Sequence, residues 1–156
     1  MSIAESVHDL CAREGVAYEI VTHSPTVSSA RSAQKAHVPG DKVAKSVVLE
    51  DEHGYVMAVI PASHHLDLLA LRQELDRKLD LTAEGSLVDL FKDCAPGAIP
   101  PLGPLYGMDT VVDRTLAESQ DVYFEGGDHA SLIHVSGSDF LRLIANSRQR
   151  FISHHL

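Results

Sequence analysis

The sequence predicts an α+β fold built on a largely antiparallel or mixed β-sheet. Segments with the composition of strands outnumber segments with helical spacing. The best-defined pair, residues 43–49 and 55–61, flanks the turn signal Asp51-Glu52-His53-Gly54 and predicts a β-hairpin. The regular strand–helix alternation of a doubly wound fold is missing, so a mixed architecture is favoured.

Length and composition indicate one globular domain over residues 1–156. Apolar residues make up 44% and charged residues 22% of the chain, and no apolar run reaches the roughly 20 residues that a membrane span needs. The first residues lack the basic and apolar regions of a secretory signal. We therefore expect a cytoplasmic protein without membrane association, in which Cys11 and Cys94 are reduced; a single disulfide is the alternative.

The net charge of −9 argues against non-specific binding to nucleic acid. The charge is unevenly distributed, however. Residues 24–49 contain Arg31, Lys35, Lys42 and Lys45 with Asp41 as the only acid, so this window carries +3 and the rest of the chain −12. A local basic patch on an acidic body suits contact with the end of an RNA rather than with a long duplex; chance clustering of surface charge is the alternative.

The N-terminal half begins with helical spacing over residues 3–14, and Gly15 stands at the position of a C-terminal cap. Residues 18–22 predict a short strand. The segment His23-Ser24-Pro25-Thr26 ends it, and Ser28 or Thr26 can cap a second helix that runs to about residue 37. The two strands of the hairpin follow.

After the hairpin, Ser63-His64-His65 is expected to be a connector, and Asp67 an N-cap for a helix that reaches about residue 79. A short strand at 81–82 and a short helix at 84–92 precede a loop rich in Gly and Pro. Strands are expected at 109–112, 122–125 and 132–135, then a helix at 140–146 capped by Ser138. The tail, residues 147–156, is expected to be frayed.

Lys45 lies in the first hairpin strand, on the face that also carries Val43, Val47 and Leu49. An ammonium group on an apolar face is costly to desolvate unless something pairs with it. Two explanations stay open: a functional lysine, or a lysine of an edge strand that reaches water and protects the edge.

The loop Gly97-Ala98-Ile99-Pro100-Pro101-Leu102-Gly103-Pro104 is longer and stiffer than a connector requires. A rigid loop can hold main-chain groups toward a pocket, where fixed dipoles stabilise charge on a substrate carbonyl oxygen. A stiff surface loop is the alternative. The later segment Gly126-Gly127-Asp128-His129 is expected to be a hairpin turn rather than the site of a catalytic histidine.

Signatures of other chemistries are missing from the sequence. Adjacent histidines, as in His64-His65 and His154-His155, point in different directions on a regular element, and no Cys or carboxylate stands beside them at ligand spacing. No nucleophile elbow and no phosphate-binding Gly loop occurs. We expect neither a metal site nor a cofactor.

The sequence resembles the YbaK/prolyl-tRNA synthetase-associated editing-domain family over about residues 16–145. The strand around Lys45 is similar to the family's lysine-bearing strand, and Gly97 to Pro101 is similar to its G-x-x-x-P loop, which Leu102-Gly103 continues. Each motif is weak alone, but their order and spacing make the match specific. Further matches are His23-Ser24-Pro25-Thr26 with Ser28 and Ala30, Val59-Ile60-Pro61-Ala62, Leu66-Asp67, Val112-Asp113 with Leu116, Gly126-Gly127 and Asp139-Phe140-Leu141.

The resemblance implies a compact α+β domain whose curved mixed sheet is wrapped by helices. It also implies a freestanding deacylase that hydrolyses the ester of a mischarged aminoacyl-tRNA. Synthetase pockets separate small amino acids by only about 1–3 kcal/mol per methylene, so a second hydrolytic site raises fidelity. The expected partner is the acceptor end of an aminoacyl-tRNA carrying Ala, Ser, Thr or Cys, with a synthetase as a further partner to test.

Site residues follow from the same resemblance. Lys45 is expected to anchor substrate or stabilise charge, with action as a neutral base left open, and Gly97 and Pro101 frame the reacting ester. Ser46 is expected to be structural, and Asp113 and His129 are rim candidates. The expected substrate-binding residues are Thr26, Ser28, Ala98, Ile99, Pro100 and Gly103, and the expected tRNA contacts are Arg31, Lys35 and Lys42.

Two other function classes remain compatible with the sequence. One is a non-catalytic module that binds tRNA or a synthetase, which a hydrolysis assay distinguishes. The other is a hydrolase of a different small acyl ester, which the acidic body of the protein keeps open and which competition by deacylated tRNA distinguishes.

Overall fold

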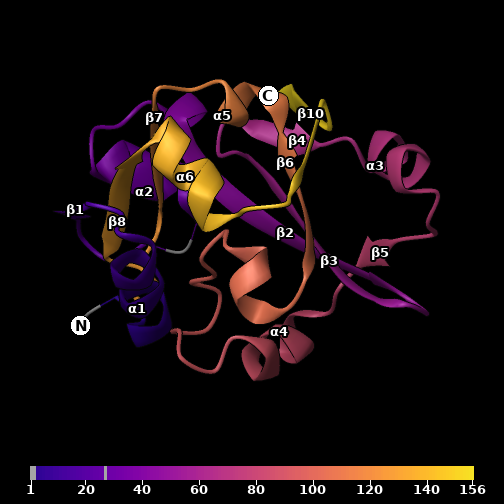
Figure 1. The fold of residues 1–156 in the computed structure, drawn as a ribbon, viewed down its shortest axis with the longest axis horizontal. Helices are drawn as coiled ribbons and strands as arrows, with labels where there is room; N and C mark the ends of the chain where they lie inside the picture. Colours follow the sequence, from indigo (N-terminus) through magenta and orange to yellow (C-terminus); the bar gives the residue numbers. More distant parts are fainter. Residues whose placement is uncertain (1–2, 27) are drawn as a thin grey trace.

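The computed structural model describes residues 3–26 and 28–156 (Figure 1). Its helices are α1 (Glu5–Glu14), α2 (Ser29–Lys35), α3 (Leu68–Leu75), α4 (Glu84–Leu90), α5 (Arg114–Ala117) and α6 (Gly137–Leu143), with 3₁₀ turns η1 (Gly40–Lys42) and η2 (Gly103–Tyr106). Its strands are β1 (Glu19–Thr22), β2 (Val43–Asp51), β3 (Gly54–Pro61), β4 (His64–Leu66), β5 (Asp80–Leu81), β6 (Asp109–Asp113), β7 (Asp121–Glu125), β8 (Ser131–Ser136), β9 (Arg148–Arg150) and β10 (Ser153–His155).

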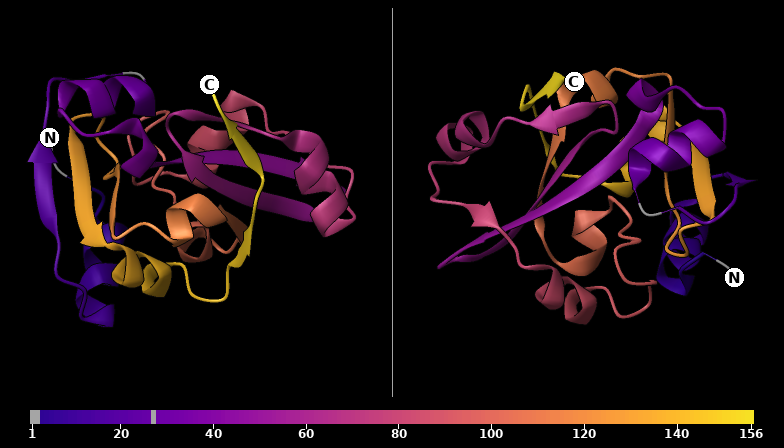
Figure 2. Two further views of the ribbon diagram at one scale, coloured as in Figure 1. Left: turned by 90° about the horizontal axis from the view of Figure 1, so that it is seen from above. Right: turned by 180° about the vertical axis from the view of Figure 1, so that it is seen from behind.

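The main sheet is mixed, as the sequence predicts. Its strand order is β1-β8-β7-β2-β3-β6-β9, with β5 paired to the far end of β2, and a small second sheet joins β10 to β4. The pairs β2–β7, β3–β6 and β6–β9 are parallel and the other pairs are antiparallel. The twisted sheet crosses the molecule, and the helices pack around it (Figures 1 and 2).

The hairpin at the centre of the sheet is confirmed. β2 and β3 pair antiparallel from Ala44 with Pro61 to Asp51 with Gly54, and Gly54 takes a φ of 130° in the turn. Buried residues occur on both faces of β2: Val43 and Leu49 on one side, Ala44 and Val48 on the other. β2 is therefore an interior strand with cores on both sides.

Helix ends follow the expected capping chemistry in most places. Gly15 ends α1 with a φ of 65°, the Ser28 hydroxyl caps α2, and Asp67 accepts a hydrogen bond from the Ala70 amide at the start of α3. Two expectations were wrong. α3 ends at Leu75 rather than near residue 79, because Asp76 adopts a left-handed conformation with a φ of 50°.

The cap of the last helix also differs from the prediction. Ser136, not Ser138, accepts the hydrogen bond from the Asp139 amide, and α6 begins at Gly137. A Cβ atom at Gly137 would overlap the carbonyl oxygen of Ser119, so only glycine fits at this close approach of two backbones.

The C-terminal tail is ordered, contrary to the expectation of a frayed end. β9 pairs parallel with β6, and β10 pairs antiparallel with β4, so His64 and His65 of the expected connector belong to a strand that extends to Leu66. Asp113 accepts hydrogen bonds from the Ile152 amide at 3.0 Å and the Ser153 hydroxyl at 2.7 Å, and the Ile152 side chain is fully buried. These contacts join the tail to the body of the sheet.

The two cysteines are not joined to each other. Cys11 is buried in α1, and Cys94 is half-buried just before the Gly- and Pro-rich loop. Burial raises the pKa of the Cys94 thiol to about 12. Along the described ranges, we find no helix with the length and apolar character needed to cross a membrane.

Candidate active site

The main sheet forks where β7 separates from β2. The two strands pair only through Val43 with Tyr123 and Ala44 with Phe124. The next residues along them are Lys45 on β2 and Glu125 on β7. Beyond this point β7 turns back toward β8, and β2 continues on that side without a strand partner until β5 joins it at Leu49 and Glu50. A space between the two strands is therefore built into the topology.

The Gly- and Pro-rich loop crosses this fork. On the β7 side, the Ala95 amide donates to the Gly127 carbonyl at 2.8 Å, and His129 Nε2 donates to the Pro96 carbonyl at 2.6 Å. On the β2 side, the Ser46 hydroxyl donates to the Ile99 carbonyl at 3.3 Å. Hydrogen bonds at both ends thus fix the loop across the opening, and it is more than a surface connector.

A cavity of about 180 Å³ lies in the fork. Three parts of the chain meet there: the start of α2, the β2 strand, and the loop with the turn between β7 and β8. Most of the lining side chains are polar. The lining residues are Ser28, Ser29, Ser32, Lys45, Ser46, Gly97, Ile99, Glu125 and His129.

The Lys45 ammonium group is held by main-chain carbonyls. Nζ donates to the His64 carbonyl at 2.6 Å and lies 3.5 Å from the Ala62 carbonyl. Burial lowers the pKa of this lysine, because desolvation disfavours its charged form. β7 pairs with β2 only as far as Ala44, so Lys45 stands where one edge of β2 becomes free, and both explanations of this lysine stay open.

Glu125 is a buried carboxylate at the other side of the fork. It is 9% exposed, and its Oε1 atom accepts hydrogen bonds from the amides of the next turn at 2.9–3.0 Å, those of Gly127, Asp128 and His129. These bonds give the turn between β7 and β8 its shape. The turn is the predicted hairpin connection, with His129 in a left-handed conformation (φ 62°).

Gly97 faces this turn across the cavity. Its φ is 81°, a conformation that L side chains rarely adopt. A Cβ atom placed there would lie 3.6 Å from Cε1 and 3.8 Å from Nε2 of His129. The position thus has space for a methyl group but requires glycine for backbone reasons.

The structure brings together only some of the residues that the sequence suggests for the site. Lys45, Gly97, Ser28 and Ile99 line the cavity, and so does the rim candidate His129. The remaining candidates are buried outside the lining: Thr26, Ala98, Pro100, Pro101 and Gly103.

Two of these buried residues have clear packing roles. The Thr26 hydroxyl lies 2.5 Å from that of Ser32, behind the cavity wall. A Cβ atom at Gly103 would overlap Thr110 Oγ1 and lie 3.1 Å from Met57 Cβ, so this glycine allows η2 to pack on the sheet.

Asp113 is not at the rim of the cavity. It is fully buried, caps α5 through the Thr115 amide, and binds the C-terminal tail. Burial alone would raise its pKa, but hydrogen bonds from Thr115, Ser153 and the Ile152 amide outweigh this effect, so the pKa is lowered. Its role in the structure is to hold three segments together.

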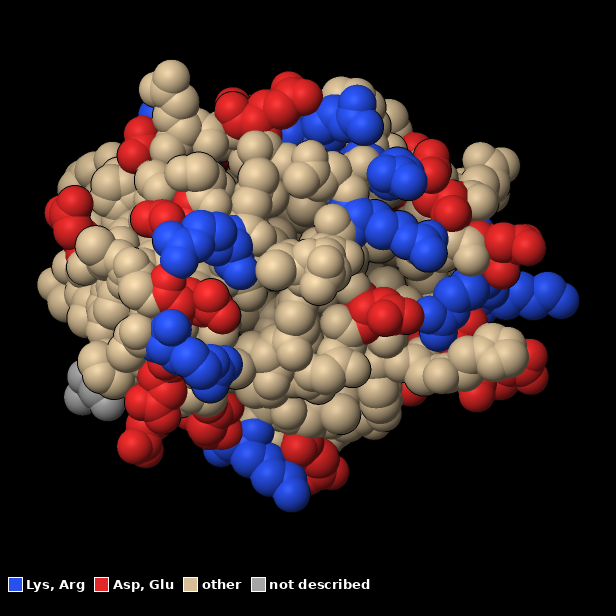
Figure 3. Space-filling view, viewed as in Figure 1, with Lys and Arg blue, Asp and Glu red and all other residues tan. Residues whose placement is uncertain are grey.

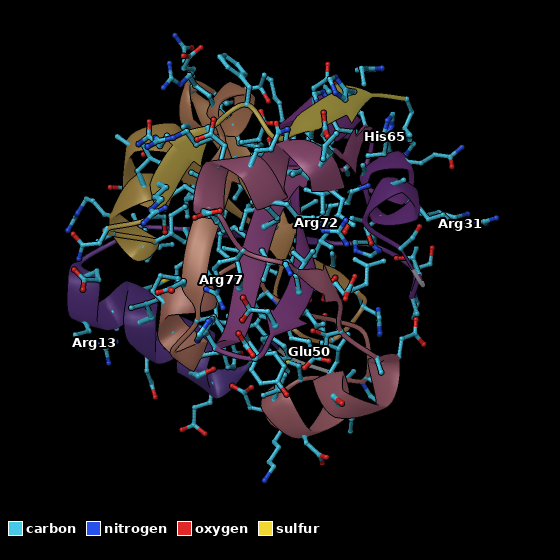
Figure 4. All side chains as sticks on the ribbon, turned by 90° about the vertical axis from the view of Figure 1, so that its right-hand side faces the viewer. Arg13, Arg31, Glu50, His65, Arg72 and Arg77 are labelled. Carbon is cyan, nitrogen blue, oxygen red and sulfur yellow. The ribbon has the colours of Figure 1, made fainter. Side chains whose placement is uncertain are left out.

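The basic candidates Arg31, Lys35 and Lys42 are exposed on α2 and η1, close in the chain to the cavity lining. None of them takes part in an ion pair with another residue of the described ranges. Arg31 projects outward from α2 (Figure 4). On the face viewed in Figure 3, by contrast, basic and acidic side chains are interspersed and form no patch of a single sign.

The sequence analysis missed Glu125 and understated Ser46. Ser46 has the structural contact that was expected, but it also lines the cavity. Glu125 gave one usable signal: an acidic residue directly before Gly126-Gly127, at a strand end, where a carboxylate can accept the free amides of a tight turn. Only the parallel pairing of β7 with β2 shows that it faces the lysine strand.

The comparisons with known proteins concern the family and the fold of the chain. A model of the aminoacyl-tRNA editing domain matches residues 23–143, more than three quarters of the chain. No curated protein matches the sequence. The matched residues include α2, the lysine strand, the Gly- and Pro-rich loop and the turn after Glu125, and they end before β9 and β10.

Three solved structures share the fold. The hypothetical protein APE2540 has a TM-score of 0.82 at 22% identity, covering 96% of this chain and 100% of that one. A candidate trans-editing enzyme for prolyl-tRNA synthetase has a TM-score of 0.82 at 20% identity, covering 97% and 96%. A candidate signal-transduction protein from Marinobacter aquaeolei VT8 has a TM-score of 0.78 at 22% identity; 95% of this chain matches 30% of that one.

Proposed function

Because the chain belongs to the aminoacyl-tRNA editing-domain family, we propose that it is a freestanding deacylase that hydrolyses mischarged aminoacyl-tRNA. The observation that carries this proposal is the cavity shared by Lys45 and Gly97. It joins a desolvated ammonium group to a loop held rigidly by hydrogen bonds at both ends. A cation and fixed main-chain dipoles are the elements that stabilise a developing oxyanion.

The reaction is the hydrolysis of a carboxylic ester. The oxygen of a water molecule bonds to the carbonyl carbon, the bond from that carbon to the ribose oxygen breaks, and a proton from the water passes to the ribose oxygen. The products are the free amino acid and the uncharged tRNA. An ester of this kind is already activated, so positioning the water and stabilising the oxyanion supply the catalysis.

Lys45 acts in its charged form in this proposal. Two carbonyls orient the ammonium group, and the third N–H is available to a terminal phosphate or to the reacting ester. The lowered pKa reflects burial, which also strengthens each charge–dipole contact made inside the cavity. A hydroxyl group of the substrate next to the ester can then assist the water, so the protein needs no nucleophilic side chain.

The loop supplies main-chain groups and the cavity sets the size of the amino acid. Gly97 and Ile99 reach the lining, while Ala98, Pro100 and Pro101 hold the backbone from behind. A space of about 180 Å³ suits a small side chain beside part of a ribose. The proposed substrates are therefore tRNAs charged with Ala, Ser, Thr or Cys.

The exposed cations Arg31, Lys35 and Lys42 are the proposed contacts for the phosphates of the acceptor end. They stand on α2 and η1, next to lining residues, and tRNA bound there would face the +3 window of an otherwise acidic chain. The proposal also includes action in the cytoplasm, with a synthetase as a further partner to test. The similarity to a candidate trans-editing enzyme for prolyl-tRNA synthetase makes tRNA for proline the first tRNA to assay.

The decisive experiment measures deacylation of four tRNAs, charged with Ala, Ser, Thr and Cys, by the wild-type protein and by Lys45→Ala. We expect hydrolysis of at least one substrate by the wild type and a loss of about 100-fold or more in the variant. Lys78→Ala, which removes an exposed lysine outside the cavity lining, is the matched control and should retain full activity.

The result also separates the other function classes. Full activity of Lys45→Ala would remove this lysine from the mechanism. Tight tRNA binding without any hydrolysis would mean a non-catalytic binding module, and hydrolysis of small acyl esters that deacylated tRNA does not inhibit would mean a different esterase.

A further inference from the structure

The cavity contains a second charged group, and it is opposite in sign to Lys45. Among the described lining residues, Glu125 is the only acidic side chain. It follows directly after the last residue of β7 that pairs with β2, just as Lys45 follows Ala44 on the other strand. The fork in the sheet therefore presents an ammonium group on one side and a carboxylate on the other.

Lys45 and Glu125 do not neutralise each other. The Lys45 ammonium group donates to the carbonyls of His64 and Ala62, and Glu125 Oε1 accepts amides of its own turn. No ion pair joins the two residues in the described part of the chain. Each charge is thus held in place by main-chain groups, and the space between the two is left for a ligand.

The geometry of the turn does not require a charge at position 125. One oxygen, Oε1, accepts all three amide hydrogen bonds, and a neutral amide oxygen would accept them equally well. The neighbouring Asp128 differs, because it uses both of its oxygens inside the turn: Oδ1 for the Ala130 amide and Oδ2 for the Ser131 hydroxyl. Because the turn between β7 and β8 does not need Glu125 to be an anion, the burial of this carboxylate requires a different explanation.

We propose that Glu125 binds the α-amino group of the aminoacyl ester and so restricts the enzyme to esters with a free amine. The inference rests on the proposed function in taking the aminoacylated end of a tRNA as the ligand. Such a ligand carries an α-amino group on one side of the ester and phosphate on the other. The two charges of the cavity, on either side of the fork, match this order.

This assignment predicts a specificity that size alone would not give. The α-amino group is a hydrogen-bond donor and, when protonated, a cation, whereas an N-acylated amine is neutral and bulkier. Esters with a blocked amine, including peptidyl-tRNA, would place a neutral, bulkier group against the Glu125 carboxylate and offer it no cation. The site would therefore not hydrolyse peptidyl-tRNA, although its ester bond is of the same kind as that of aminoacyl-tRNA.

The test compares binding of two amide analogues, 3′-alanylamino-3′-deoxyadenosine and its N-acetyl derivative, by NMR titration. Amide linkage prevents ester hydrolysis, so binding is measured whether or not the protein is a deacylase. The variant is Glu125→Gln, which keeps the acceptor oxygen of the turn and removes the charge. Asp128→Asn makes the same change in the same turn outside the lining and is the matched control.

We expect the wild type and Asp128→Asn to bind the free-amine analogue about 10-fold or more tightly than the acetylated one, and Glu125→Gln to lose this preference. Thermal melts of all three proteins check the fold. Deacylation of alanyl-tRNA and N-acetylalanyl-tRNA should show the same pattern in kcat/KM. A wild type without preference for the free amine, or a Glu125→Gln variant that keeps it, would overturn the inference, and neither result depends on whether hydrolysis occurs.

Discussion

Replacing Gly97 by alanine separates the backbone role of this residue from its role in the cavity. The φ of 81° places an alanine in the left-handed region, which costs about 1–2 kcal/mol. The nearest atoms to the new Cβ, on the His129 ring, are 3.6 and 3.8 Å away, which is ordinary contact. The loss of stability should therefore come from backbone strain alone.

The expected change in melting temperature follows from this strain. For a chain of this length, each kcal/mol lowers the melting temperature by about 2–4 °C, so Gly97→Ala should melt about 2–8 °C below the wild type. The protein remains folded at assay temperature. The new methyl group nevertheless points toward His129 across the cavity, so kcat/KM for the preferred aminoacyl-tRNA should fall by about 10- to 100-fold.

Gly107→Ala is the matched control for this prediction. Gly107 has a similar φ of 73°, a Cβ there would meet nothing within 4 Å, and the residue is not part of the cavity lining. Both variants should lose similar stability in thermal melts followed by circular dichroism, and only Gly97→Ala should lose deacylase activity. Equal activities in the two variants would refute the placement of the substrate against Gly97.

Three further predictions test packing, linkage and charge. Gly103→Ala should lower the free energy of unfolding by about 1–3 kcal/mol in urea titrations, because its Cβ would overlap Thr110; an unchanged midpoint would contradict this packing role. Asp113→Asn should destabilise the protein by about 1–3 kcal/mol at pH 7. Because the folded-state pKa of Asp113 is lowered, the ionised carboxylate stabilises the fold above its ordinary pKa of 3.8, and this stabilisation is lost as pH falls through the lowered value. The difference in unfolding free energy between wild type and Asp113→Asn should therefore narrow below about pH 4. A difference that does not change with pH would exclude this linkage. Lys42→Ala should weaken tRNA binding and reduce the slope of log K against log salt by about 0.7–0.9, measured by filter binding, whereas an unchanged slope would place the phosphates elsewhere.

The local features of the site could be predicted from the sequence, since they depend on short motifs. The side-chain pattern along residues 43–49 predicts a strand that contains Lys45, and the density of Gly and Pro after Pro96 predicts a rigid loop with more than a connecting role. Both Lys45 and Gly97 reach the same cavity, although their chemical roles stay predictions. Glu125 could not be found in this way, because its position depends on a parallel pairing between strands about 80 residues apart, which no local pattern encodes.

The C-terminal tail shows the same limit. β9 and β10 are three residues long, too short for a periodic signal, and their stability comes from partners far away in the chain. The buried carboxylate of Asp113 and the pairing of β10 with β4 decide their structure. The error at α3 had a different origin, since a single left-handed residue, Asp76, ended an apolar pattern that continues to the buried Leu79.

The narrow junction between β2 and β7 links the cavity to the packing of the hydrophobic core. Two residue pairs join the strands there, and one of their members, Phe124, packs on Phe140 of α6 with ring centroids 5.7 Å apart. Because Phe124 directly precedes Glu125, a change in this aromatic contact would be expected to shift the carboxylate relative to Lys45. Under the proposed function, activity assays would report on the packing of the hydrophobic core, and a search for altered amino-acid preference could begin there as usefully as at the cavity wall.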